Sequence, residues 1–185
     1  MPKTQRLFIA IAYKPTTKVA KLLEHLLSLA GKPTTGLRVV AVSNLHITLK
    51  FLGGVLETDI ASLCQLIEKN LSTLKPFEIN LKGLGFFRNS LWLGIDKSDP
   101  LRDLATTLDK DLAVSGFSVE TRVFVPHLTV ARIGKDGQNK IFDLQQQYGK
   151  THWGTLEVAE VLLYQSKTLP TGAEYSIVHS SRLDA

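Results

Sequence analysis

The stretch His46-Ile47-Thr48-Leu49 organises this sequence, because a second stretch, His127-Leu128-Thr129-Val130, repeats its pattern in the other half of the chain. In a β-strand successive side chains point to opposite faces. The histidine and threonine of each stretch would therefore share one face, while the apolar residues between and after them would pack on the other. We predict two strands that each present an imidazole beside a hydroxyl, as two halves of one site.

Length and composition indicate one globular domain that spans residues 1–185. Hydrophobic residues make up 44% of the chain and charged residues 21%, so a core can form without disulfides. The single cysteine, Cys64, lies in a helical pattern and is expected to be a buried structural thiol. No apolar run approaches the roughly 18 residues of a membrane span, and the first residues lack the layout of a signal peptide. We therefore expect a cytoplasmic protein, with no membrane contact and no obligate protein partner.

The formal net charge of +5 favours anionic ligands. The basic residues are scattered along the chain, unlike those of proteins that coat duplex nucleic acid. A nucleotide or an RNA end fits this moderate charge, but so does the substrate of an ordinary basic enzyme. Charge alone does not choose among these ligand classes.

Apolar residues at helical spacing predict three amphipathic helices, over residues 16–30, 57–74 and 99–116. In the last of these, Asp99 is the expected N-cap and Pro100 the first helical residue. Runs rich in β-branched and aromatic residues predict strands over residues 6–13, 37–42, 46–52, 77–84, 90–96, 123–133 and 174–179. Residues 156–166 fit a long strand or a helix, and residues 140–148 a loop or a short helix. Polar turns are expected at 135–137 and 170–172.

The order of these elements predicts an α+β fold. Each half of the chain supplies an amphipathic helix, paired strands and one His-x-Thr strand. The simplest arrangement is therefore bilobed, with two pseudo-symmetric lobes of antiparallel sheet and the helices packed outside. No linker of distinct composition separates the halves. We expect one bilobed domain whose cleft, between the lobes, holds the site.

The two motifs by themselves leave other interpretations open. Both histidines could be partly buried residues that bond to the backbone, beside threonines that simply favour strands. A metal site is disfavoured because neither stretch offers His-x-His, a nearby cysteine or a carboxylate on the same strand face. The chain has no Gly-x-Ser-x-Gly elbow, P-loop or Gly-x-Gly-x-x-Gly, so nothing supports a serine nucleophile, ATP or NAD. His25, His152 and His179 lie in no motif and are expected at the surface or in caps.

Around these motifs the chain resembles the 2H phosphoesterase superfamily, and within it the RNA 2′,3′-cyclic phosphodiesterases that are also called 2′-5′ RNA ligases. The resemblance rests on stretches that follow one another in order, namely RLFIAI at 6–11, NLHITLKFLGGV at 44–55, GLGFF and LWLGI within 83–95, GFSVETRVFVPHLTVAR at 116–132 and LYQSKTLPTGAEY at 163–175. It implies that the motifs face each other across a cleft between pseudo-symmetric lobes. It also implies that His46 is the proton donor, that His127 is the proton acceptor, and that the phosphate is bound by Thr48, Thr129 and Arg132.

Strict strand alternation does not place all of these side chains on one face. Arg132 would point away from His127, and only a β-bulge or the end of the strand would turn it inward. Lys50, in contrast, would share the face of His46, where it could add positive potential to the cleft or remain a solvated residue. Core packing is favoured over base stacking for the aromatic residues Phe51, Phe86, Phe87, Trp92 and Trp153.

The resemblance implies hydrolysis of a terminal 2′,3′-cyclic phosphate to a 2′-phosphate, on RNA ends or nucleotides, without a metal ion or an organic cofactor. His127 would take a proton from water, and His46 would protonate the departing 3′ oxygen. In reverse, a 5′-hydroxyl in place of water would give a 2′-5′ linkage. Two alternatives stay open: a non-catalytic module that binds RNA ends or nucleotides in the same cleft, and a phosphoesterase for a different small cyclic phosphate.

Overall fold

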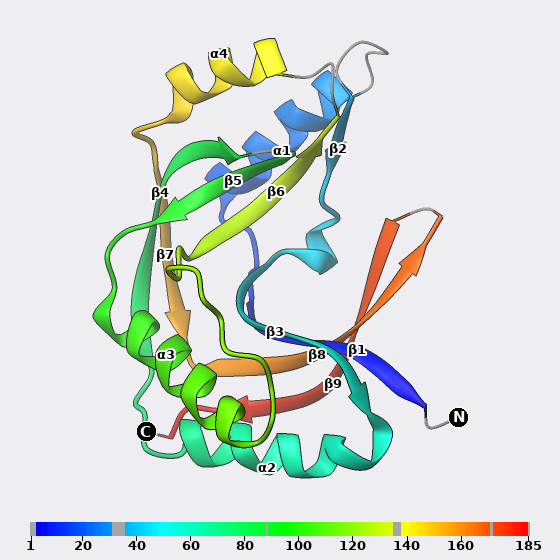
Figure 1. Cartoon of the computed structure of the whole chain (residues 1–185). Helices are drawn as coiled ribbons and strands as arrows, with labels where there is room; N and C mark the ends of the chain where they lie inside the picture. The colour runs from blue at the N-terminus through cyan, green and yellow to red at the C-terminus, as the bar shows by residue number, and fades with distance from the viewer. Residues whose placement is uncertain (1–2, 31–35, 88, 135–137, 171, 185) are drawn as a thin grey trace.

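A computed structural model describes residues 3–30, 36–87, 89–134, 138–170 and 172–184. Its strands form one curled antiparallel sheet in the order β7-β4-β5-β6-β3-β1-β8-β9, with β2 paired to β6 (Figure 1). The strands are β1 Thr4–Ala12, β2 Leu37–Val39, β3 His46–Leu56, β4 Phe77–Phe87, β5 Ser90–Ile95, β6 His127–Ile133, β7 His152–Val158, β8 Glu160–Leu169 and β9 Gly172–Arg182. The helices are α1 Thr17–Ala30, α2 Ile60–Leu71, α3 Asp99–Val114 and α4 Gln138–Tyr148, with short 3-10 turns η1 Val42–Asn44 and η2 Glu57–Asp59.

The sheet divides into two lobes that meet where Ile47 of β3 pairs with Leu128 of β6. We call β3, β1, β8 and β9, with α2 and α3, the first-motif lobe. The second-motif lobe consists of β2, β4, β5, β6 and β7, with α1 and α4. In Figure 1 α1 and α4 lie at the top of the view against the second-motif lobe, whereas α2 lies at the bottom, below the first-motif lobe, and α3 lies at the left, above α2. The predicted α+β fold, with lobes of antiparallel sheet and outer helices, is confirmed.

The two lobes are interleaved along the chain, so the expectation of one lobe in each half was wrong. β1 belongs to the first-motif lobe, but α1, which follows it, packs against β2 and β7 of the other lobe. The chain then returns to the first-motif lobe between β7 and β8, which only Ala159 separates. Each lobe therefore combines segments from both halves of the sequence.

The hydrophobic core lies between the sheet and the helices. Helical spacing gives each helix one apolar stripe, and in α3 this stripe is almost fully buried: Leu101, Leu104, Leu108 and Leu112 are at most 1% exposed. The N-cap of α3 is Ser98 rather than Asp99, because Ser98 has the extended backbone and its hydroxyl accepts a hydrogen bond from the amide of Leu101. Asp99 is already helical and pairs with Arg102.

Several predicted elements differ at their ends. β6 begins only at His127, after a segment without regular structure over residues 117–126. The ambiguous run 156–166 belongs to two successive strands, β7 and β8, and residues 140–148 fall within α4. The predicted turn at 135–137 lies outside the described residues, as does position 171 of the turn at 170–172.

Two expectations from composition can be compared with the structure. In the described ranges, no helix is both long enough and apolar enough to cross a bilayer. Cys64 on α2 is half-buried rather than buried, because it lies at the border between the apolar stripe and the exposed face of the helix. Partial burial raises the pKa of its thiol, and the charge of Glu68 adds to this effect.

Candidate active site

The two His-x-Thr motifs lie side by side where the lobes meet. Ile47 pairs with Leu128 in antiparallel register, so each histidine lies opposite the threonine of the other motif. Ile47 and Leu128 are fully buried, and the motif residues on either side of them project to the opposite face. The result is an approximately two-fold arrangement in which His46 and His127 occupy one diagonal and the two threonines the other.

Each imidazole is held by a backbone carbonyl two residues earlier. Nδ1 of His46 lies 2.7 Å from the carbonyl oxygen of Asn44, and Nδ1 of His127 lies 2.8 Å from that of Val125. A carbonyl oxygen only accepts hydrogen bonds, so Nδ1 carries a proton in both rings. Nε2 of each ring is thereby left to exchange protons with a ligand.

A β-bulge follows each motif. The partners of β5 on β6 jump from Thr129 to Ala131 and leave Val130 unpaired, and the partners of β1 on β3 jump over Leu49 in the same way. One extra residue reverses the alternation of the side chains that follow it. Arg132 therefore lies on the motif face, where it is exposed and its guanidinium donates a hydrogen bond to the hydroxyl of Ser90.

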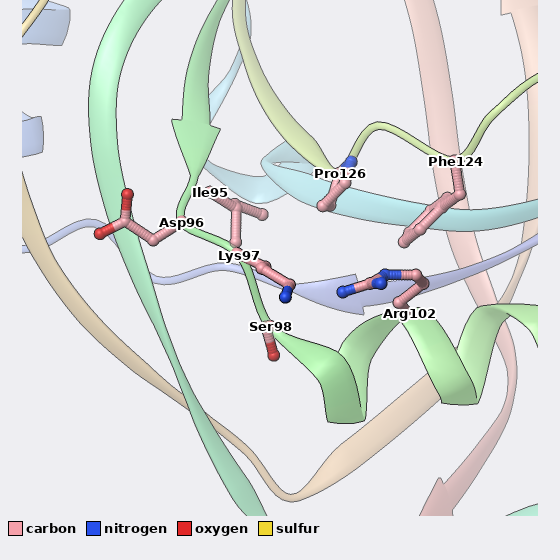
Figure 2. A pocket seen from close by; sticks show the side chains of 7 residues that line it. All are labelled: Ile95, Asp96, Lys97, Ser98, Arg102, Phe124 and Pro126. Atoms are coloured by element: carbon pink, nitrogen blue, oxygen red, sulfur yellow. The ribbon is translucent and has the colours of Figure 1, made fainter.

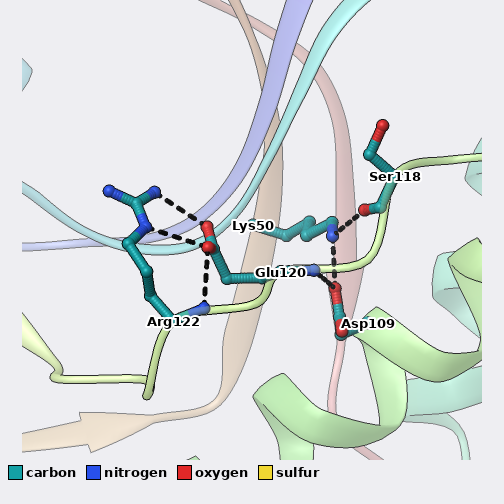
Figure 3. Close-up of polar contacts among 5 residues, drawn as sticks. All are labelled: Lys50, Asp109, Ser118, Glu120 and Arg122. Carbon is teal, nitrogen blue, oxygen red and sulfur yellow. Dashed lines mark hydrogen bonds and ion pairs between the residues drawn. The ribbon is translucent and has the colours of Figure 1, made fainter.

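Lys50 does not share the face of His46, so simple alternation was wrong for this residue. The bulge turns its side chain inward, and only 6% of it is exposed. Its ammonium forms an ion pair with Asp109 of α3 and donates to the carbonyl oxygen of Ser118 (Figure 3). The same carboxylate accepts a hydrogen bond of 3.1 Å from the amide of Glu120. These bonds hold the irregular segment 117–126, which precedes His127, against β3.

Aromatic rings pack against both imidazoles. The His46 ring lies 5.0 Å from the Phe8 ring and 5.2 Å from the Tyr175 ring, centroid to centroid. The His127 ring lies 5.2 Å from that of Phe87, in an edge-to-face arrangement like that of His46 and Tyr175. Such contacts add to the carbonyl hydrogen bonds in holding the orientation of each imidazole.

The aromatic residues that were expected in the core are divided between core and site. Trp153 is 3% exposed and its indole N–H donates to the carbonyl oxygen of Gly83, so core packing is correct there. Phe51 and Phe87 are 65% and 44% exposed, so core packing was wrong for both. The bulge on β3 gives Phe51 the same place after its motif that Arg132 has after the other. The remaining two, Phe86 and Trp92, are half-buried.

The two histidines do not have equivalent environments. Burial lowers the pKa of the His46 imidazole, and the positive charges of Arg132 and His127 add to this effect. The hydrogen bond to the carbonyl of Asn44 acts in the opposite direction. His46 therefore gives up its proton readily, and an anion between the two rings would counteract the repulsion from Arg132 and stabilise the imidazolium form.

The described residues do not gather metal ligands. Within the part of the chain that the structure describes, no group of three His, Cys, Asp or Glu side chains is arranged to hold a metal ion. The histidines outside the motifs are spread over the surface: His25 contacts the hydroxyl of Tyr148, His152 is exposed and His179 lies beside Glu68.

A pocket of about 320 Å³ lies at the beginning of α3 (Figure 2). Figure 2 shows Lys97 and Arg102 on one side of it and Phe124 with Pro126 on the other. Neither the threonines nor the histidines of the motifs line this pocket. Lys97 and Arg102 are both paired with Asp99, so the cations of the pocket already have a carboxylate partner.

Comparison with known proteins adds to this geometry. Residues 15–166 match a family model described as the 2′-5′ RNA ligase superfamily. A protein of Methanothermobacter thermautotrophicus named RNA 2′,3′-cyclic phosphodiesterase is 34% identical over 152 residues, which cover 79% of this chain and 82% of the relative. A protein of the same name from Methanocaldococcus jannaschii is 33% identical over 181 residues, or 94% of this chain and 98% of the relative.

Solved structures extend the likeness over the whole fold. E. coli LigT complexed with 3′-AMP superposes with a TM-score of 0.76 at 26% identity, over 99% of this chain and 100% of the other. A crystal structure described as a phosphoesterase gives a TM-score of 0.75, also at 26% identity and with the same coverage.

Proposed function

The chain belongs to the 2′-5′ RNA ligase superfamily, and we propose from this premise that it is an RNA 2′,3′-cyclic phosphodiesterase. The observation that carries the proposal is the two-fold set of imidazoles and hydroxyls around the Ile47–Leu128 pair, in which each imidazole keeps Nε2 free. The substrate is an RNA end or a nucleotide with a terminal 2′,3′-cyclic phosphate, and the product is a 2′-phosphate.

Hydrolysis requires one proton to leave the attacking water and another to reach the departing ribose oxygen, on opposite sides of phosphorus. In the proposed mechanism Nε2 of His127 takes the proton of the water as its oxygen bonds to phosphorus. Nε2 of His46 delivers a proton to the 3′ oxygen as the bond between phosphorus and that oxygen breaks. The diagonal placement of the rings suits this in-line geometry, and each positioned proton transfer typically contributes about 10² to 10⁴ in rate.

The threonines and Arg132 would hold the phosphate. The hydroxyls of Thr48 and Thr129 donate to the non-bridging oxygens, and the guanidinium of Arg132 supplies positive charge as these oxygens become more negative in the transition state. The bound anion also compensates the repulsion that lowers the pKa of His46. Substrate binding would thus supply the protonated His46 that the leaving oxygen needs.

The same residues would support ligation. A 5′-hydroxyl that replaces water would lose its proton to His127 as its oxygen bonds to phosphorus, and the bond from phosphorus to the 3′ oxygen would break as His46 protonates that oxygen. The product is a 2′-5′ linkage, formed with no need for ATP. RNA ends are the substrates of both hydrolysis and ligation. We place the proposed activity in the cytoplasm.

The proposal is tested by incubation with a short RNA that ends in a 2′,3′-cyclic phosphate, followed by product analysis. The unmodified protein is expected to yield a 2′-phosphate, with a bell-shaped pH dependence. His46→Ala and His127→Ala are each expected to lower kcat by at least about 10²-fold while the substrate still binds. His152→Ala, which removes an exposed histidine outside the site, is the matched control and should retain the parent rate.

Three outcomes would count against the proposal. A 3′-phosphate product would reverse the assignment of the leaving oxygen. Hydrolysis at the parent rate by both motif variants would refute the two-histidine mechanism. Binding of the RNA without turnover by the unmodified protein would instead support a non-catalytic module that recognises RNA ends.

A further inference from the structure

Arg38 lies beside Arg132 on the face that carries the motifs. β2 pairs with β6 so that Arg38 is the direct partner of Arg132. Direct partners in an antiparallel pair project to the same face, and the bulge at Val130 has turned Arg132 to the motif face. Both arginines are exposed. In Figure 1 β2 runs along the end of β6 that lies away from the first-motif lobe, so this face continues beyond the motifs.

Two arginines in direct cross-strand contact repel each other unless an anion lies between or beside them. Arg132 donates to Ser90, a neutral group. In the described ranges neither arginine forms an ion pair with a carboxylate. Exposed guanidinium groups that lack carboxylate partners and lie next to a phosphate-binding site are well suited to bind further phosphate oxygens.

We propose that Arg38 binds the phosphate on the 5′ side of the terminal nucleotide of an RNA substrate. The inference rests on the proposed function, because it extends the same site to a second phosphate. Arg132 is the arginine whose charge acts on His46, so it lies near the reacting group. Arg38 lies on β2, one β-strand further from the reacting phosphate than Arg132. From there its guanidinium would bind the next phosphate of the RNA chain.

A contact with a phosphate that does not react stabilises the bound substrate and the transition state to a similar extent. Its loss is therefore expected to raise KM with little change in kcat. It should also affect an oligonucleotide more than a mononucleotide, since only the oligonucleotide has the second phosphate.

The test compares 2′,3′-cyclic AMP with the dinucleotide ApA that ends in a 2′,3′-cyclic phosphate. For Arg38→Gln, the ratio of kcat/KM for the dinucleotide to that for the mononucleotide is expected to fall roughly tenfold, mainly through KM. The dependence of log kcat/KM on log salt concentration should also become shallower for the dinucleotide, by about 0.7, which is the value for one contact with a single-stranded phosphate. Neither change is expected from a purely structural role.

Arg182→Gln is the matched control, because Arg182 is an exposed arginine on β9, the edge strand of the first-motif lobe. It should leave the substrate ratio and the salt dependence unchanged. An unchanged ratio in Arg38→Gln overturns the inference, and so does an equal loss on both substrates, which would mean that Arg38 acts on the reacting phosphate or on the fold. Hydrolysis of neither substrate by the unmodified protein would be a failure of the proposed function itself.

Discussion

Replacement of Lys50 by methionine is expected to lower the free energy of unfolding by about 3 kcal/mol. Lys50 is 6% exposed and its partner Asp109 is 20% exposed. Methionine retains an apolar stem but removes the charge, so Asp109 keeps a largely buried negative charge and the Ser118 carbonyl loses a donor. Removal of one partner of a buried ion pair costs about 3–5 kcal/mol, and the partial exposure of Asp109 favours the lower end of this range.

Urea denaturation measures this loss directly, and a decrease of about 3 kcal/mol corresponds to a Tm lower by about 6–12 °C in a domain of this size. The double variant Lys50→Met with Asp109→Leu removes both charges and is expected to regain most of the stability. Lys82→Met is the control, because Lys82 and Asp96 are 53% and 45% exposed and lie 3.9 Å apart. An exposed pair of this kind contributes less than about 1 kcal/mol.

The ion pair is also expected to affect catalysis, because it fastens the segment that contains the carbonyl partner of His127. Lys50→Met should lower kcat even at temperatures where the variant is fully folded, because the Ser118 carbonyl loses its donor. The double variant should not restore kcat, since it also removes the acceptor of the Glu120 amide. A Lys50→Met protein as stable as the Lys82→Met control would refute the reasoning. A double variant no more stable than Lys50→Met would show that the unpaired charge is not the cause of the loss.

Two further changes test the surroundings of the histidines. Arg132→Gln removes a positive charge that disfavours the imidazolium, so the pKa of His46 should rise, as measured by NMR titration of its ring protons; a lower pKa would contradict the assignment. Gly85→Ala would place a Cβ atom 2.4 Å from the ring of Trp92 and is expected to cost about 1–3 kcal/mol of stability in urea denaturation. Gly54→Ala, whose added Cβ would have no atom closer than 3.8 Å, should cost less, and equal losses would show that the indole is not the obstacle.

Much of the site could be predicted from the sequence because it depends on local periodicity. The alternation of His46 and Thr48 with buried neighbours is a property of the strand itself, and the same is true of the second motif. The bulges were not predictable in the same way, since neither Leu49 nor Val130 is a glycine or a proline that would mark an irregular position. The position of a bulge depends on the pairing with the partner strand and on the contacts that the residues after the bulge make.

One extra residue after each motif explains why strict alternation places Lys50 and Arg132 on the wrong faces. At the second motif a signal existed: Val130 and Ala131 are consecutive apolar residues followed by an arginine, which breaks a period of two. At the first motif Lys50 gave no such signal, because its inward position depends on Asp109, which is distant in the sequence. The interleaving of the lobes was equally hidden, since it depends on which strand α1 packs against and not on the pattern of α1 itself.

The two-fold symmetry of the site does not extend to the residue five positions after each histidine. After equivalent bulges, one motif presents the exposed ring of Phe51 and the other the guanidinium of Arg132. A nucleotide has an apolar base and an anionic phosphate, so an aromatic side and a cationic side favour one orientation of the substrate over its reverse.

The same asymmetry supports the proposed division of roles. His46 is the histidine whose pKa is lowered by burial, and its ring packs against Phe8 and Tyr175. A histidine with a lowered pKa is the stronger acid once it is protonated, which suits the donor to the ribose oxygen. Because the bound phosphate favours that protonation, Arg132 and the substrate have opposite effects on His46, and the acid would form chiefly when there is a bond to break.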